Sequence, residues 1–343
     1  MSSVDVTTIN QINTTATIIV LVLSFFNFIF GGTGLTLNIL VFRRPFLRRE
    51  SCAVYFFWST CYSLLVVFVI MPIRILSDGY SIDISIYNIV ICKTEAYIFH
   101  VIRTISVWLI LMACIDRYFN SSSKAQIRRM SSLKIARIST VFISILIIIL
   151  YSPMMIYFDL TYSMNGSGNI VAACSSRKGI CRSFDAFWYM ILYSLFPSLL
   201  MLLFGFLTIL NLRRHRQIVP VGPAGNNSVV RRTDTQLLRM LIAQVCVIII
   251  STLPFCIVQL YSSFTTNLVK DPLRVAIESL ASRVAGTIPY FAHMSSFYLY
   301  TLTGTTFRKE LIKIIKRWRH PNQNLMPVTQ AETQHMSMLR SRL

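Results

Sequence analysis

Seven long apolar segments constrain the fold of this chain more than any other feature of its sequence. They span roughly 17–42, 52–73, 88–115, 135–158, 186–212, 236–262 and 280–303. About 20 apolar residues in a helix cross the hydrocarbon core of a bilayer and satisfy their own backbone polar groups there. Only 13% of the residues are charged, against about 25% in soluble domains. We therefore predict an all-α membrane protein with a seven-transmembrane helix bundle at residues 17–304.

The basic residues predict the topology of that bundle. The formal net charge is +20, from 33 Lys and Arg against 13 Asp and Glu. Most of these cations follow the first, third, fifth and seventh segments, in the stretches 43–49, 124–137, 213–239 and 308–342. Such an excess marks the cytoplasmic side, so we expect a multi-pass plasma-membrane protein with an extracellular tail at residues 1–16. The charge is then a topology signal, and we expect no nucleic-acid partner.

Several modifiable residues fall on the predicted outside. Asn13 and Asn165 lie in Asn-X-Ser/Thr glycosylation acceptors. Cys92 lies at the start of the third segment, and Cys174 and Cys181 lie in the loop before the fifth. Because the outside is oxidising, we expect a disulfide from Cys92 to either Cys174 or Cys181. The bridge would hold this loop over the bundle.

The tripeptide Asp116-Arg117-Tyr118 ends the third segment, and Arg117 lies 25 residues after Cys92. A charged pair where a membrane helix meets the cytoplasm is costly to insert and indicates a functional site. With this pattern the chain resembles the rhodopsin-like family of G-protein-coupled receptors over about residues 17–318. Further residues carry the resemblance: Asn38 in the first segment, Pro153, Pro197 and Pro254 in the fourth to sixth, and Tyr300 seven residues before Phe307-Arg308.

The resemblance implies roles for these residues. Arg117 would be held at rest by an acid at the base of the sixth helix and would contact a heterotrimeric G protein once released. Asp234, 20 residues before Pro254, takes the place of that acid; the alternative is a solvated charge at a helix start. Asp116, Tyr118 and Tyr300 complete the expected coupling switch. Asn38 and the three prolines would be structural, the prolines as hinges.

The chain also departs from the family pattern. By spacing, Ser63 replaces the second-helix aspartate that helps hold sodium, and Thr252 replaces the sixth-helix tryptophan. Gly205 replaces the fifth-helix tyrosine, and Ser296-Phe297 replaces the seventh-helix Asn-Pro. These departures put sodium regulation and the usual switch in question and indicate a divergent branch of the family.

Polar side chains on the third segment form the candidate ligand site. Glu95, Phe99, His100 and Arg103 recur at helical spacing and share one face, which lines the ligand pocket in the family. Arg103 lies deep in the segment, so we expect it to bind an acidic group of the ligand, with help from Arg283. The alternative is an internal salt bridge from Arg103 to Glu278 or Glu95.

The ligand class is predicted from comparison with subfamilies. Phe99 stands where amine receptors carry an aspartate, and Tyr290, which we also expect to contact the ligand, stands where opsins carry a lysine. We therefore expect a peptide ligand, with an uncharged or acidic small molecule as the alternative. The end of the seventh segment is similar to that of invertebrate FMRFamide-type peptide receptors. We expect no cofactor and no metal site, and we interpret His100 and His293 as packed polar residues.

Residues 305–319 predict a short amphipathic helix on the inner leaflet. Its apolar residues recur at helical spacing among cations that favour anionic lipid: Phe307, Leu311, Ile314, Ile315 and Trp318. Residues 320–343 are polar and predict a disordered cytoplasmic tail.

The sequence thus favours a receptor that converts binding of an extracellular ligand into G-protein activation, and it lacks the motifs of an enzyme. One alternative is a seven-helix ligand-binding scaffold that does not couple to G proteins. A transporter or channel is the other alternative, although internal repeats, which many transporters contain, are not evident.

Overall fold

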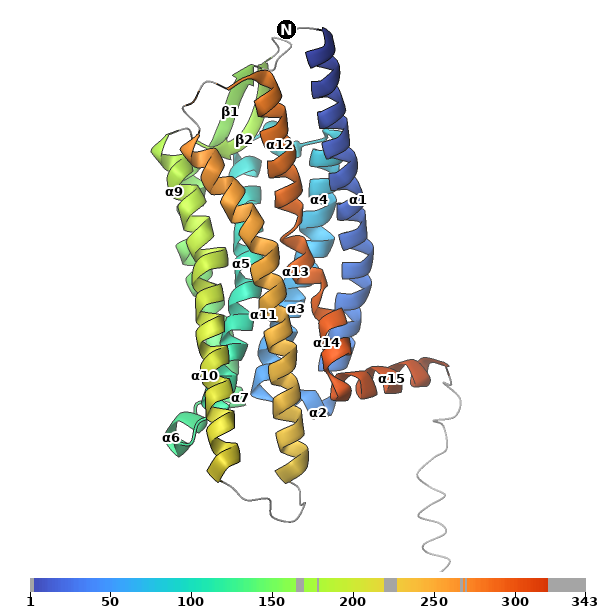
Figure 1. The fold of residues 1–343 in the computed structure, drawn as a ribbon, viewed down its shortest axis with the longest axis vertical. Coiled ribbons are helices and arrows are strands. Elements are labelled where there is room, and N and C mark those ends of the chain that lie inside the picture. The colour runs from blue at the N-terminus through green and yellow to red at the C-terminus, as the bar shows by residue number, and fades with distance from the viewer. Residues whose placement is uncertain are drawn as a thin grey trace, which may run out of the picture.

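Six helical stretches are long and apolar enough to cross a membrane: Val6–Phe42, Ser51–Gly79, Ile89–Asn120, Leu133–Tyr157, Ile180–Arg214 and Leu238–Phe264. The structure is a computed structural model that describes residues 3–164, 170–177, 179–218, 227–265, 268 and 270–319. The long helices run side by side along the longest axis of the molecule (Figure 1). They coincide with the first six predicted segments.

The first three spans begin with α1 (Ser3–Phe42). The second span is continuous but changes helical pitch: α3 (Ser51–Leu65), η1 (Val66–Ile70), α4 (Met71–Arg74) and η2 (Ile75–Gly79), in which η1 and η2 are π-helical turns. The third is α5 (Ile89–Asn120). Short helices connect these spans: α2 (Pro45–Arg48), η3 (Ile84–Ile86) and, after α5, α6 (Ala125–Arg128).

Each of the next three spans contains a proline, and the fourth and fifth are interrupted near it. The fourth is α7 (Leu133–Leu150) with α8 (Met154–Tyr157). The fifth is α9 (Ile180–Tyr189), the π-helical η4 (Met190–Leu195) and α10 (Phe196–Ile218), and the sixth is α11 (Asn227–Phe264). Pro153 separates α7 from α8, Pro197 lies at the start of α10 just after η4, and Pro254 lies inside an unbroken α11. Proline has no backbone N–H, so it weakens the helical ladder at each of these places.

Part of the predicted N-terminal tail at 1–16 is helical, because α1 begins at Ser3 and continues into the first span. Asn13 is an exposed residue within this helix, and its carbonyl accepts a hydrogen bond from the Thr17 hydroxyl at 3.1 Å. The extension runs beside α12 (Figure 1). Continuing the helix satisfies backbone groups that a separate tail would leave to solvent.

The segment predicted as the seventh span is divided into α12 (Pro272–Thr287), α13 (Tyr290–Met294) and α14 (Ser296–Thr303). Pro289 lies at the first break, where the Phe291 N–H donates to Ile288 and the Ala292 N–H to Pro289, each bond spanning only three residues. None of these three helices has the length and apolarity of the six spans among the described residues.

Helix α15 (Thr305–Arg319) lies across one end of the bundle, away from the N-terminus (Figure 1). Phe307, Leu311 and Ile314 are buried on its inner side. The Phe307 ring lies 5.8 Å from that of Phe42 and 6.0 Å from that of Tyr300, centroid to centroid. These aromatic contacts attach α15 to the ends of α1 and α14.

The outer surface of the bundle is apolar. On α1, Ile18, Val22, Phe25 and Ile29 are all exposed at helical spacing. On α7, exposed residues recur in the same way: Ile138, Val141, Phe142, Ile145 and Ile149. Water would not tolerate such large apolar stripes, whereas lipid solvates them. The chain is therefore a multi-pass membrane protein.

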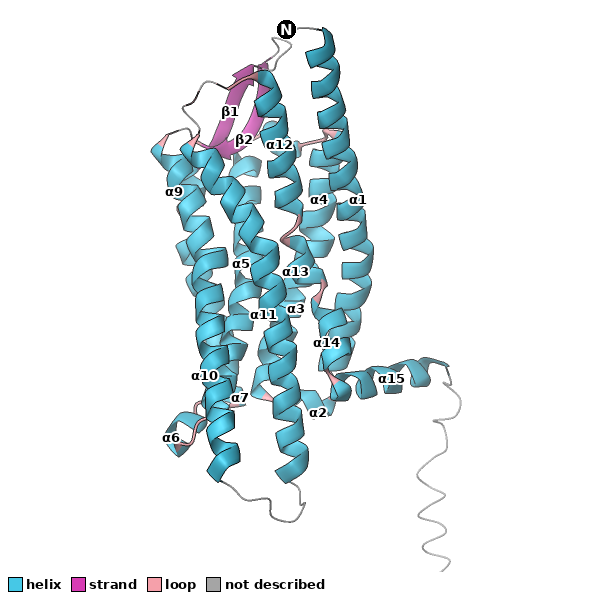
Figure 2. Ribbon diagram, in the orientation of Figure 1, coloured by secondary structure: helices cyan, strands magenta, loops and turns pink. Residues whose placement is uncertain are grey.

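The prediction of an all-helical chain is wrong between α8 and α9. There β1 (Phe158–Met164) pairs antiparallel with β2 (Ile170–Ser176), with Leu160 opposite Cys174. Figure 2 shows this hairpin at the same end of the bundle as the N-terminus. Pairing the two strands satisfies the backbone N–H and C=O groups of this segment, which lies outside the helical bundle. Asn165 lies outside the described residues.

The hairpin is fastened to the bundle by a disulfide and braced by an ion pair. Cys92 at the start of α5 is bonded to Cys174 on β2, with Cα atoms 5.6 Å apart. Cys181, the other candidate, is a free thiol on α9. Arg177 lies 2.9 Å from Asp159, and its hydrogen bond holds the pKa of the Asp159 carboxyl below its usual range. The bridge is therefore to Cys174.

We expect Cys174→Ser to lower the melting temperature of the purified protein in detergent, because loss of a native disulfide costs about 2–5 kcal/mol in small secreted domains. The matched control is Cys181→Ser, which removes a thiol that forms no bridge. Thermal unfolding followed by tryptophan fluorescence measures both. Equal losses for the two variants would contradict the assigned pairing.

Candidate functional site

Helix α5 connects the two ends of the bundle at its centre. In its most apolar stretch 67% of the residues are buried inside the protein, the largest share among the six spans. One end carries the disulfide-linked hairpin and a cavity, and the other carries Asp116-Arg117-Tyr118. Any coupling between an outer site and an inner site therefore has a direct structural route along α5.

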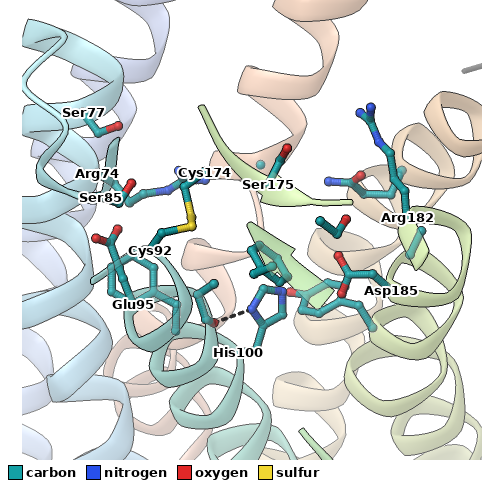
Figure 3. Close-up of a pocket in the computed structure, with 18 of the residues that line it drawn as sticks. Arg74, Ser77, Ser85, Cys92, Glu95, His100, Cys174, Ser175, Arg182 and Asp185 are labelled. Atoms are coloured by element: carbon teal, nitrogen blue, oxygen red, sulfur yellow. Dashed lines mark hydrogen bonds between the residues drawn. A yellow bond between two sulfur atoms is a disulfide. The ribbon is translucent and has the colours of Figure 1, made fainter. Parts of the chain in front are cut away.

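A cavity of about 320 Å³ lies under the hairpin. Its walls come from α4, α5, β2, α9, α11 and neighbouring turns (Figure 3). All four residues predicted to share one face of α5 line it: Glu95, Phe99, His100 and Arg103. The volume falls in the range of about 300–1,000 Å³ typical of small-ligand sites.

Arg103 is the most deeply buried cation of this cavity, with 7% of its surface exposed. Its Nε donates to the Phe99 carbonyl at 3.1 Å. The guanidinium carbon lies 5.6 Å from the ring centroid of Tyr189 and 5.7 Å from that of Tyr290. These cation–π contacts hold a charge that three elements, α5, α9 and α13, enclose.

An internal salt bridge does not account for Arg103. Among the described residues, no carboxylate lies within ion-pair distance of it. Glu278 instead binds Lys270 at 2.5 Å and Arg274 at 3.0 Å. A buried charge is expensive unless it is paired, and here the backbone carbonyl of Phe99 and two aromatic rings are the contacts that Arg103 makes.

The cavity also contains acidic groups that the sequence did not single out as a set. Figure 3 shows Glu95 and Asp185 on opposite sides of His100. Asp185, on α9, has a buried Oδ1 with no hydrogen-bond partner among the described residues. Arg74 and Arg182 line the same cavity. The cavity is therefore lined by side chains of both charge signs.

His100 is held as a packed polar residue. Its Nδ1 lies 2.6 Å from the Ala96 carbonyl, the distance of a hydrogen bond in which the ring donates. The ring contacts Tyr189 edge-on, with centroids 5.1 Å apart. No cluster of His, Cys, Asp and Glu able to hold a metal occurs in the described part of the chain.

Two predicted ligand residues lie elsewhere. Arg283, on α12, donates to the Thr17 hydroxyl at 3.2 Å and to the Asp78 carbonyl, so it joins α1, η2 and α12 and does not line the cavity. Tyr290 contributes through its ring contact with Arg103 and is itself buried. Position along a segment did not distinguish these roles, because the partners of Arg283 come from α1 and η2, which only the fold brings to α12.

A neutral polar network fills the middle of the bundle. The Ser63 hydroxyl lies 2.9 Å from the Ser106 hydroxyl and 3.2 Å from Nδ1 of His293. Nε2 of His293 lies 3.4 Å from the Tyr193 hydroxyl. Nearby, Asn38 Nδ2 donates to Ser296 at 3.1 Å. The network thus joins polar side chains from α1, α3, α5, η4, α13 and α14, and none of those named is an Asp, Glu, Lys or Arg.

This network does not fit a sodium ion. The small cavity beside it measures about 10 Å³ and is lined by hydroxyl, amide, imidazole and apolar groups, with no carboxylate among its described residues. Ser63 stands where the family carries an aspartate. A cation there would lack an anionic ligand, and the space is about that of one water molecule.

At a second position where the chain departs from the family, a hydrogen-bonded side chain takes the place of the usual residue. Thr252, which replaces the sixth-helix tryptophan, lies 2.9 Å from the Ser194 hydroxyl. This contact joins η4 to α11 just before Pro254. Where the family uses a large aromatic ring, this chain uses a small pair of hydroxyl groups.

The inner end of α5 carries a buried charged cluster. Asp116 accepts hydrogen bonds from Ser51 at 2.9 Å and from Ser131 at 2.8 Å. Nη2 of Arg117 lies 3.2 Å from Asp116 and 3.7 Å from Glu50. Asp116 and Arg117 are 4% and 3% exposed. Sequence reasoning missed Glu50, Ser51 and Ser131, because only folding brings them to α5.

The remaining predicted switch residues are Asp234, Tyr118 and Tyr300. Asp234 belongs to α11, but its side chain lies outside the described residues. The Tyr118 ring packs 5.6 Å from that of Phe204. Tyr300 is buried with its ring 5.2 Å from that of Phe56. These contacts place Tyr118 beside α10, and Tyr300, on α14, against α3.

Comparison with known families agrees with this architecture: a cavity at one end of a membrane bundle and a buried arginine cluster at the other. The family model described as "7 transmembrane receptor (rhodopsin family)" matches residues 36–288. The chain belongs to this family, whose members are receptors rather than enzymes. No curated protein sequence matches the chain.

We expect His293→Leu to lower the melting temperature by several degrees, because it leaves the buried hydroxyls of Ser63 and Tyr193 short of a partner, at about 1–3 kcal/mol per group. Ile250→Ala is the control, since that side chain is 72% exposed on the outer surface. Thermal unfolding in detergent compares the two. An unchanged midpoint for His293→Leu would show that the network does not stabilise the bundle.

Proposed function

We propose that this chain is a plasma-membrane receptor that converts binding of an extracellular ligand into activation of a heterotrimeric G protein. The N-terminus and the hairpin face outward, and the basic stretches lie at the end that carries Arg117. Asn13, exposed on α1, is then a glycosylation site, as is Asn165. The observation that carries the proposal is Arg117, a buried arginine held by Asp116 and Glu50 at the inner end of α5 in a rhodopsin-family chain.

Activation in this scheme is a change in the partners of Arg117. At rest, its ion pairs hold the ends of α3 and α5 together, with Asp234 as a proposed further partner from α11. A ligand that binds more tightly to a state with these pairs released shifts the population toward that state. Arg117 then becomes available to the G protein.

The proposed ligand is a peptide with groups of both signs. Its carboxylate or carboxamide end binds Arg103 between the rings of Tyr189 and Tyr290. A basic side chain or amino group pairs with Asp185, whose buried Oδ1 lacks a protein partner among the described residues. A charged hydrogen bond at each end would orient the ligand across the cavity.

A second candidate function is a ligand-binding scaffold that does not couple. The observation that favours it is the replacement of usual switch residues by hydroxyl pairs, such as Thr252 with Ser194. The two functions share the outer cavity and differ only in whether Arg117 engages a G protein after the ligand binds. Substitution at Arg117 therefore separates them.

We expect Arg117→Ala to abolish G-protein activation in cells challenged with a pool of short amidated neuropeptides, at matched surface display. We also expect Glu50→Gln to raise basal nucleotide exchange about two- to fivefold, since an ion pair of this kind contributes up to about 1 kcal/mol. The control is Glu310→Gln, which breaks a pair with Lys313 on α15. A response that survives Arg117→Ala would contradict the proposed switch.

Arg103→Gln should weaken the potency of an active peptide about 10- to 100-fold, because a hydrogen bond to a charged group contributes about 1.5–3 kcal/mol. Arg283→Gln is the matched control. Its contacts lie outside the cavity, so potency should stay within about twofold. Dose–response curves at equal surface expression measure both. A larger loss for Arg283→Gln would place the ligand nearer α12 than proposed.

A further inference from the structure

Ser131 connects the loop between α5 and α7 to the charged cluster. Its hydroxyl donates to Asp116 Oδ1 at 2.8 Å and lies 3.0 Å from the hydroxyl of Ser51. Ser51 donates to the other oxygen of the same carboxylate at 2.9 Å. The half-buried Ser131 therefore holds its loop against the inner ends of α3 and α5.

The residues before Ser131 are basic and exposed, and the acidic peptide groove of a protein kinase can recognise such residues. Arg128 and Arg129, three and two residues upstream, are both exposed at the end of α6. Arginine pairs with carboxylates through two parallel hydrogen bonds. A kinase whose peptide groove carries carboxylates would read Arg128-Arg129-Met130 and place the next hydroxyl at its catalytic centre.

We propose that Ser131 is a phosphorylation site for a cytosolic, arginine-directed protein kinase, and that the phosphate releases this loop from Asp116. In the reaction the Ser131 Oγ attacks the γ-phosphorus of ATP. The bond from that phosphorus to the bridging oxygen of the β-phosphate breaks, ADP leaves, and the hydroxyl proton passes to a base of the kinase. No redox change or further co-reactant is involved.

The phosphate cannot occupy the place of the hydroxyl. It carries about −1.5 to −2 charges and has no proton to donate to a carboxylate at neutral pH. It would lie against Asp116, and Glu50 is a second acid in the same cluster. Repulsion and the lost hydrogen bond together move Ser131 and its loop away from α5. One further consequence rests on the receptor function proposed above: the displaced loop lowers G-protein activation.

Ser132 provides an internal comparison. It follows the same arginines, but its hydroxyl accepts from the Ile135 N–H as the N-cap of α7. A phosphate there would lie at a helix N-terminus, where negative charge is favourable. Modification of Ser132 should therefore leave the contact with Asp116 in place.

The test uses the full-length protein in membranes, incubated with an arginine-directed kinase and ATP, with a standard basic peptide confirming that the kinase is active. Mass spectrometry locates the phosphate, and hydrogen–deuterium exchange reports the loop at 121–132. We expect phosphate on Ser131 in the wild type and in Ser132→Ala. We expect none in Ser131→Ala and strongly reduced labelling in the double variant Arg128→Gln/Arg129→Gln.

The labelled wild type should exchange amide protons of this loop about tenfold faster, as expected from loss of a hydrogen bond to a charged group. Ser131→Ala treated with the kinase should not change. Labelling of Ser132 alone, no labelling of the folded protein, or labelling of Ser131 without faster exchange would each overturn the proposal. These readouts need neither a ligand nor a G protein, so they fail independently of the proposed function.

Discussion

Keeping the charges of α5 away from lipid is the constraint on which the rest of the bundle depends. Arg103, Asp116 and Arg117 are each less than 10% exposed, on a helix that would otherwise cross a bilayer as an ordinary apolar span. Charges at such depth must face protein or an aqueous cavity. The other helices therefore enclose α5, and their apolar sides face outward.

The two charged regions of α5 are satisfied in different ways. At the inner end, hydroxyls and acids from α3 and the adjoining loops surround Asp116 and Arg117 with direct contacts. At the outer end, aromatic rings flank Arg103 while no carboxylate pairs with it among the described residues. The first arrangement is suited to holding a state, and the second to receiving a ligand. Between them lies a network without charge, around Ser63 and His293.

That neutral centre has a consequence for how the ends communicate. In a two-state bundle, interactions that differ between states carry the coupling. Here the contacts that cross the middle are hydrogen bonds such as those of Asn38 with Ser296 and Thr252 with Ser194. Each is modest in net energy, and pairs of small polar side chains occupy places where the family has a cation ligand or a large ring.

The sequence by itself determined the first six spans and the end of the bundle at which the basic residues gather. It also determined the shared face of Glu95, Phe99, His100 and Arg103. These depend on hydropathy, charge and helical periodicity, which are local properties. Only the tertiary structure decided that Cys174 bonds Cys92, that Arg283 holds α1, and that Ser51 and Ser131 meet Asp116. It also decided the hairpin and the break at Pro289. The disulfide and the contacts of Arg283, Ser51 and Ser131 depend on distances between segments far apart in the chain, which no local pattern encodes. The hairpin and the break are local, but the apolar pattern of their segments did not indicate them.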